Sequence, residues 1–81
     1  MTSQAYVQYD DVPEALFERA QWRVDDSGVR FVAFDGCPLV GLIVESAEGA
    51  QIEFAWPHNP ELRHALGDWL THHGIHFTVV S

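Results

Sequence analysis

In the stretch "VRFVAFDGCPLVGLIV" (residues 29–44), Asp35 and Gly36 lie between two apolar runs. An Asp-Gly pair flanked by apolar residues is a strong short-range signal for a β-hairpin. The preceding residues, "QWRVDDSG" (Gln21–Gly28), add a strand that ends in a turn at residues 26–28. The central part of the chain therefore predicts three consecutive antiparallel strands.

Outward from this hairpin, the chain continues with a period of two. The segment "ESAEG" (45–49) predicts a further turn. It is followed by "QIEFAW" (51–56), in which Ile52, Phe54 and Trp56 alternate with residues expected to point outward, Gln51, Glu53 and Ala55. Near the start of the chain, "QAYVQY" alternates in the same way. These patterns add a fourth strand to the meander and a separate strand before it.

Helices are expected on either side of the meander, over Val12–Ala20 and Pro60–His73. In "DDVPEALFERA", Asp11 and Glu14 have the spacing of a capping box. In "HNPELRHALGDWLTHHG", Asn59 is the expected N-cap and the proline after it the first helical residue. The segment "IHFTVV" then predicts a last strand.

The expected fold class is α+β, with a small antiparallel β-sheet of four to five strands in a β-meander packed with two α-helices. The predicted order is β-α-β-β-β-β-α-β, in one domain spanning residues 1–81. A single cysteine, Cys37, excludes an intramolecular disulfide and suits a reducing compartment. The first residues have neither the basic nor the apolar region of a signal peptide, so we expect a cytoplasmic protein.

Charge is the most unusual feature of the composition. Twelve acidic residues face four arginines and no lysine, which gives a formal net charge of −8. Such a surface repels nucleic-acid phosphates and anionic lipids, so neither nucleic acid nor a membrane is an expected direct partner. A basic protein surface is the expected partner. The candidate partner-binding residues are the outward acids Glu14, Glu18, Asp25, Asp26, Glu45, Glu48 and Glu53.

The stretch "LTHHGIHFTVV" (70–80) places three of the five histidines close together. A helix end explains it without a ligand, because Gly74 suits the left-handed position just after a helix. Ile75 would then contact Leu70, the apolar contact that accompanies a Schellman motif. We expect this segment to be a capped helix end followed by a strand.

A metal site is the alternative reading of the same histidines. His64, Asp68 and His72 follow one another at intervals of four residues, so adjacent pairs could chelate a divalent ion. Positions eight apart diverge by about 80° around an ideal helix, so the three cannot converge on one ion without a further ligand. His76 after the helix, or His58 before it, could supply that ligand.

No enzyme activity and no cofactor are expected. Cys37 has no helix N-terminus or strand-to-helix elbow beside it to activate the thiol, and the chain has no Gly-rich phosphate loop. The ten aromatic residues are expected mainly in the core.

The expected function is a non-enzymatic acidic interaction module that docks on a basic, nucleic-acid-binding surface of a partner. Small acidic inhibitors that phages encode, anti-CRISPR-like proteins or nucleic-acid mimics, match it in size and charge. The alternative is a His/Asp metal-binding domain with a regulatory or hydrolytic role. The oligomeric state is open and includes a homodimer.

Overall fold

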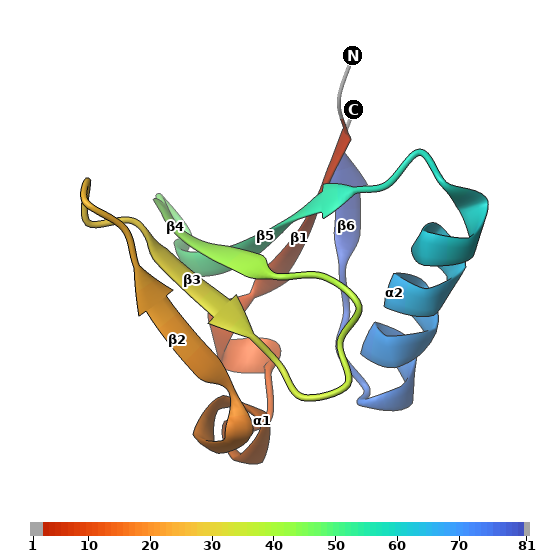
Figure 1. Cartoon of the computed structure of the whole chain (residues 1–81), viewed down its shortest axis with the longest axis horizontal. Helices are drawn as coiled ribbons and strands as arrows, with labels where there is room; N and C mark the ends of the chain where they lie inside the picture. Colours follow the sequence, from red (N-terminus) through yellow and green to blue (C-terminus); the bar gives the residue numbers. More distant parts are fainter. Residues whose placement is uncertain (1–2, 81) are drawn as a thin grey trace.

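An antiparallel sheet and two α-helices make up the computed structural model, which describes residues 3–80 (Figure 1). The elements in chain order are β1 (Ser3–Gln8), the 3-10 helix η1 (Tyr9–Asp11), α1 (Glu14–Arg19), β2 (Gln21–Val24), β3 (Arg30–Ala33), β4 (Gly41–Ser46), β5 (Gly49–Trp56), α2 (Pro60–His72) and β6 (Thr78–Val80). The expected α+β class and the order of the elements are confirmed.

The sheet has six strands, in the order β2-β3-β4-β5-β1-β6. Strands β2 to β5 form the expected meander, in which each strand pairs with the next along the chain. Strand β1 pairs with β5 on one side and with β6 on the other. The expected range of four to five strands is therefore too low, because the first and last strands both join this one sheet.

The predicted turn at Asp35 and Gly36 forms. The connection between β3 and β4 that contains it is longer than the tight hairpin turn that the Asp-Gly pair predicts. The Cys37 N–H donates to the Phe34 carbonyl at 3.1 Å, yet β3 ends before Phe34 and β4 begins only at Gly41. Pro38 lies in this connection and has no N–H to donate to a strand ladder. Phe34 is buried in the core, so the chain leaves the sheet there to pack this ring.

The core lies between one face of the sheet and the helices. Val32, Ile52 and Phe54 from the sheet are fully buried, as are Leu66 and Leu70 from α2. Removing a buried leucine side chain of this kind costs about 2–5 kcal/mol of stability. Partly buried residues of α1, Leu16 and Phe17, extend the same core. Both α-helices thus contribute to the covered face of the sheet.

The first helix is shorter than expected and lacks the predicted capping box. Helix α1 begins at Glu14 after Pro13, whose backbone is extended and whose side chain makes no cap hydrogen bond. Asp11 belongs instead to the separate turn η1, and Val12 between the two helices is buried. Because η1 and the buried valine place Asp11 outside the first turn of α1, its carboxylate cannot cap that helix.

The second helix has the ends expected from the sequence. The Asn59 side chain accepts hydrogen bonds from the N–H groups of Glu61 and Leu62, and Pro60 follows as the first helical residue. At the other end, Gly74 has φ +70° and the Ile75 N–H donates to the Leu70 carbonyl at 2.9 Å. These features are a Schellman motif. Strand β6 begins only at Thr78, since Ile75 is buried as part of this cap.

Candidate functional site

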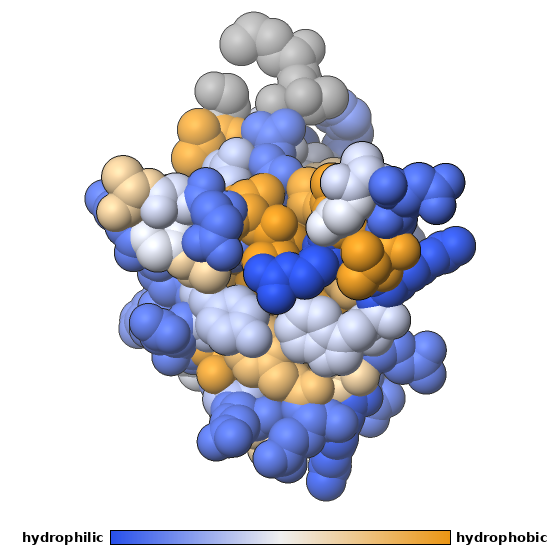
Figure 2. All heavy atoms as spheres, turned by 90° about the vertical axis from the view of Figure 1, so that its left-hand side faces the viewer, coloured by the Kyte–Doolittle hydropathy of each residue, from blue (hydrophilic) through white to orange (hydrophobic). Residues whose placement is uncertain are grey.

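An open hollow of about 470 Å³ lies where η1, α1 and β2 meet. We call it the acid-aromatic hollow. Figure 2 shows the side of the molecule on which β2 lies, and pale to orange side chains are exposed there between blue hydrophilic ones. The residues that line the hollow are Tyr9, Asp10, Val12, Glu14, Phe17, Glu18 and Trp22.

Three aromatic rings stack in the hollow. The Tyr9 and Phe17 ring centroids are 4.5 Å apart, and those of Phe17 and Trp22 are 5.8 Å apart. Phe17 also contacts Phe34, which joins the stack to the core. Trp22 is 44% exposed, so the expectation that the aromatic residues are mainly core is wrong for this ring. The short helix α1 brings the stack together, because it returns the chain from Tyr9 to the start of β2.

Three carboxylates surround these rings. Asp10 lies in η1, and Glu14 and Glu18 lie one turn apart on α1. All three residues are exposed, and none of them takes part in an ion pair within residues 3–80. A guanidinium group can pair with carboxylates and stack on aromatic faces at the same time. The arrangement therefore suits an arginine side chain of a partner.

The other predicted partner-binding acids do not line this hollow. Asp25 serves its own turn, since its side chain accepts hydrogen bonds from the N–H groups of Ser27 and Val29 at 2.9 Å and from the Ser27 hydroxyl at 2.7 Å. The bond from the Ser27 hydroxyl, followed by that from the Val29 N–H, lowers the pKa of Asp25. Asp26 is the exposed neighbour in this turn.

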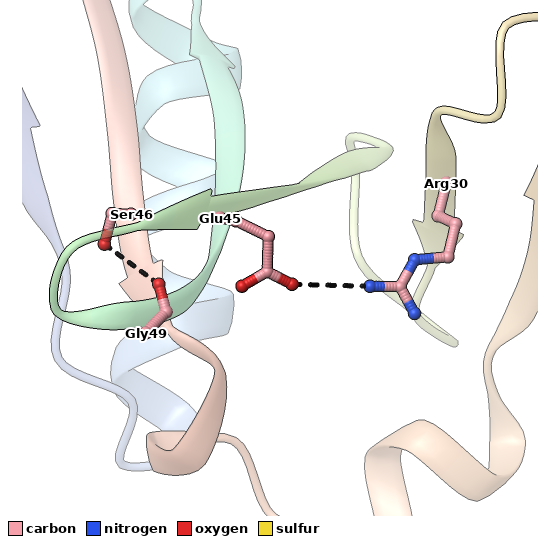
Figure 3. Close-up of polar contacts among 4 residues, drawn as sticks. All are labelled: Arg30, Glu45, Ser46 and Gly49. Carbon is pink, nitrogen blue, oxygen red and sulfur yellow. Dashed lines mark hydrogen bonds and ion pairs between the residues drawn. The ribbon is translucent and has the colours of Figure 1, made fainter.

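Glu45 and Glu48 lie at the same end of the meander as the Asp25 turn, because β2 and β4 both end there. Glu45 faces Arg30 at 3.9 Å, a long and exposed ion pair that contributes little stability (Figure 3). In the turn that connects β4 to β5, the Ser46 hydroxyl donates to the Gly49 carbonyl at 2.9 Å. Glu48 lies in this turn and is exposed.

Glu53 lies on β5 and is half-buried. It accepts a hydrogen bond of 2.8 Å from the Tyr6 hydroxyl. This bond, then burial and the nearby carboxylate charge, raise the pKa of Tyr6. The seven predicted acids are thus divided among the hollow, one end of the meander and the face of the sheet.

The candidate metal ligands are only partly brought together. His64 Nε2 lies 3.3 Å from Asp68 Oδ2 on the exposed side of α2. His72 instead contacts the ring of His73, which itself packs on Trp69. His76 is exposed beyond the helix. Within residues 3–80, no three His, Cys, Asp or Glu side chains gather in a group that could hold a metal ion.

Cys37 is half-buried in the loop between β3 and β4. Burial raises the pKa of its thiol, although a backbone hydrogen bond at Leu39 acts in the opposite direction. A raised pKa lowers the amount of the nucleophilic thiolate at neutral pH. The environment of the thiol therefore does not activate it.

The sequence reasoning identified Glu14 and Glu18 but missed the partners that complete the hollow, Tyr9, Asp10 and Trp22. The adjacency of an aromatic residue and an acid in "YDD" could have pointed to Tyr9 and Asp10, whereas no local signal marks Trp22. Among the described residues, no helix is long and apolar enough to cross a membrane.

Comparison of the chain with models of protein families, with curated proteins and with solved structures found no match.

Proposed function

We propose that this chain is a non-enzymatic interaction module that docks on a basic, nucleic-acid-binding surface of a partner protein. The observation that supports the proposal is the acid-aromatic hollow, where three carboxylates that form no ion pair within residues 3–80 surround a stack of three rings. The proposed biological role is that of an inhibitor of phage type, anti-CRISPR-like, which occupies the surface in place of nucleic acid.

The hollow offers an arginine the two features that a nucleic acid offers. Nucleic acids present negative phosphates, with which arginine forms charge-assisted hydrogen bonds, and flat bases, on which its guanidinium stacks. In this proposal the carboxylates of Glu14 and Glu18 pair with the arginine as phosphates would, and the ring of Trp22 stacks on its guanidinium as a base would. The hollow is open, so a side chain on the surface of a folded partner can enter it.

The remaining acids support the proposal through the long-range field. A net charge of −8 attracts a basic partner and accelerates association, even where a particular acid makes no contact. The acids at the end of the meander, Asp26, Glu45 and Glu48, are assigned this steering role.

The experiment is a titration of the isotope-labelled chain with a short arginine-rich peptide, followed by amide chemical shifts. We expect the largest shifts at Tyr9–Trp22, with quenching of Trp22 fluorescence. A lysine-rich peptide of equal length and charge should bind more weakly, because an ammonium group lacks the planar surface that stacks on Trp22.

Two results would contradict the proposal. Shifts spread evenly over all exposed acids would show non-specific attraction without a site. Equal affinity for the arginine and lysine peptides would show that the aromatic stack plays no part in binding. Trp22→Leu is the matched variant, since it keeps an apolar side chain but removes the ring.

A further inference from the structure

The face of the sheet opposite the core carries one continuous row of residues. The registers place Arg23 opposite Phe31, Phe31 opposite Leu42, and Leu42 opposite Glu53. They continue from Glu53 to Tyr6 and from Tyr6 to Thr78. Residues directly opposite one another share a face, so the row crosses all six strands at one level. In sheet order it is Arg23, Phe31, Leu42, Glu53, Tyr6 and Thr78.

This open face is close to neutral, unlike the rest of the molecule. The strands contain four charged residues, Arg23, Arg30, Glu45 and Glu53. Arg30 and Glu45 alternate with the row and so point to the other face, which leaves one cation and one anion on the open face. Two copies with a net charge of −8 repel each other, and they can approach most closely through a face that carries no net charge.

The open face is also hollowed and apolar beside the row. One hollow of about 460 Å³ is lined by Phe31, Ala33 and Val40 together with residues of β2. Another, of about 280 Å³, lies between Phe31, Val40, Leu42 and Ala55. Val40 is 56% exposed between the two. These hollows can accept apolar side chains of a facing surface.

We propose that the open face is the contact between two copies of this chain, related by a two-fold axis that runs along the strands between β3 and β4. This axis places β2 of one copy over β5 of the other, and β3 of one copy over β4 of the other. It does not shift the residues of one copy along the strand direction relative to those of the other. Arg23 of one copy then faces Glu53 of the other, and Phe31 faces Leu42. In a two-fold contact each such pair occurs twice.

The two charged residues are suited to this pairing. Neighbouring strands are about 4.8 Å apart, so Arg23 and Glu53 lie three strands and about 14 Å apart in one copy and cannot pair with each other there. Within residues 3–80, the side chain of Arg23 has no ion-pair or hydrogen-bond partner. Glu53 receives one hydrogen bond, through Oε1, and its other oxygen can accept one from a facing guanidinium.

The contact is small. A patch four strands wide falls at the low end of specific interfaces, at or below about 1,200 Å² in total, so we expect a dimer that forms at micromolar to high micromolar concentration. None of the row residues lines the acid-aromatic hollow, although Trp22 borders both that hollow and the one beside Arg23.

The experiment is a charge exchange followed by sedimentation equilibrium over a range from about 5 µM to 1 mM, which brackets the affinity of a small interface. Arg23→Glu places two acids opposite each other, and Glu53→Arg places two arginines opposite each other. Each variant alone should weaken the dimer by about tenfold or more. A mixture of the two variants restores both pairs, because the new glutamate then faces the new arginine and the native residues face each other. The mixture should therefore form a heterodimer with close to the native affinity.

The matched control is Arg30→Glu, which makes the same charge change on a neighbouring strand but on the other face. It should leave the dimer intact. Circular dichroism of each variant verifies the fold. Dilution of the wild-type protein, followed by amide shifts, tests the same surface without a substitution and should affect β2 to β5.

The proposal is overturned by a wild-type protein that stays monomeric throughout the concentration range. It is also overturned by a dimer whose affinity Arg23→Glu leaves unchanged. A dimer formed by edge pairing of β2 would behave in this way. A mixture of the two single variants that stays monomeric would rule out the two-fold register.

Discussion

Tyr6 and Glu53 lie directly opposite each other on β1 and β5, and the Tyr6 hydroxyl donates to the Glu53 carboxylate at 2.8 Å. The pair links the first strand, β1, to the last strand of the meander, β5. It also holds the Glu53 carboxylate in a fixed position on the open face of the sheet. The consequence is a stability that depends on the protonation of a tyrosine.

We expect Tyr6→Phe to remove part of the alkaline sensitivity of the protein. The pKa of Tyr6 is raised in the folded state, so the stability that this bond contributes is present below the unfolded value of 10.0 and is lost as the pH rises through the folded pKa. The free energy of unfolding of the wild type should fall between pH 9 and pH 11 by more than that of Tyr6→Phe. Tyr9→Phe is the control, since no hydrogen bond from its hydroxyl to a carboxylate is present within residues 3–80. An equal fall in Tyr6→Phe and the wild type would contradict the prediction.

At the β2–β3 turn, Asp25→Ala should destabilise the protein at neutral pH and have little effect in acid. The hydrogen bonds from Ser27 and Val29 lower the pKa of Asp25, so their contribution is present above the unfolded value of 3.8 and is lost as the pH falls through the folded pKa. Urea unfolding at pH 7 and at pH 2.5 measures the difference. Asp26→Ala, in the same turn, is the control and should be nearly neutral at both pH values. A constant penalty for Asp25→Ala across this range would refute the assigned cause.

Two glycine substitutions, one inside α2 and one just after it, should have opposite effects. Gly74→Ala should cost about 1 kcal/mol of stability, because alanine resists the positive φ of the Schellman position. Gly67→Ala should stabilise by up to about 1 kcal/mol, since it lies inside the helix, where an added Cβ would meet only the edge of Phe77 at ordinary contact distance. Thermal unfolding of both variants tests the pair. A Gly74→Ala variant as stable as the wild type would show that the helix end is not capped in this way, and a destabilised Gly67→Ala variant would contradict the prediction for the helix interior.

The thiol of Cys37 should react slowly. Half-burial limits access and raises the pKa, so alkylation by iodoacetamide at pH 8 should be slower in the folded protein than in the protein unfolded in urea. Cys37→Ser should leave binding of the arginine-rich peptide unchanged. Rapid alkylation of the folded protein, or loss of binding with the fold preserved, would give this residue a functional role.

Most of the fold could be predicted because its signals are local. The alternation of Ile52, Phe54 and Trp56 fixes the inward face of β5, and Asn59 and Gly74 mark the two ends of α2. The Asp11 cap failed for a reason that is not local, because burial of Val12 and the turn η1 separate that residue from α1.

The candidate sites depend on longer-range geometry. Tyr9 and Trp22 stack on the same ring, Phe17, only because α1 folds back across the end of the sheet, and no spacing in the sequence predicts the angle at which it does so. The row from Arg23 to Glu53 depends on three successive registers. Alternation predicts which face a residue occupies, but it does not predict which residue lies opposite it on the next strand.

Two charge reversals distinguish a specific site at Glu14 and Glu18 from general attraction between an acidic chain and a basic partner. Glu14→Lys with Glu18→Lys alters the hollow, whereas Glu45→Lys with Glu48→Lys makes the same charge change at the end of the meander. The dissociation constant of the arginine-rich peptide, measured by calorimetry at several salt concentrations, should rise by about tenfold or more for the first pair and by clearly less for the second. The affinity of the wild type should fall as salt is added. Equal losses for the two pairs, or binding indifferent to both reversal and salt, would show that Glu14 and Glu18 do not form a specific site for a basic partner.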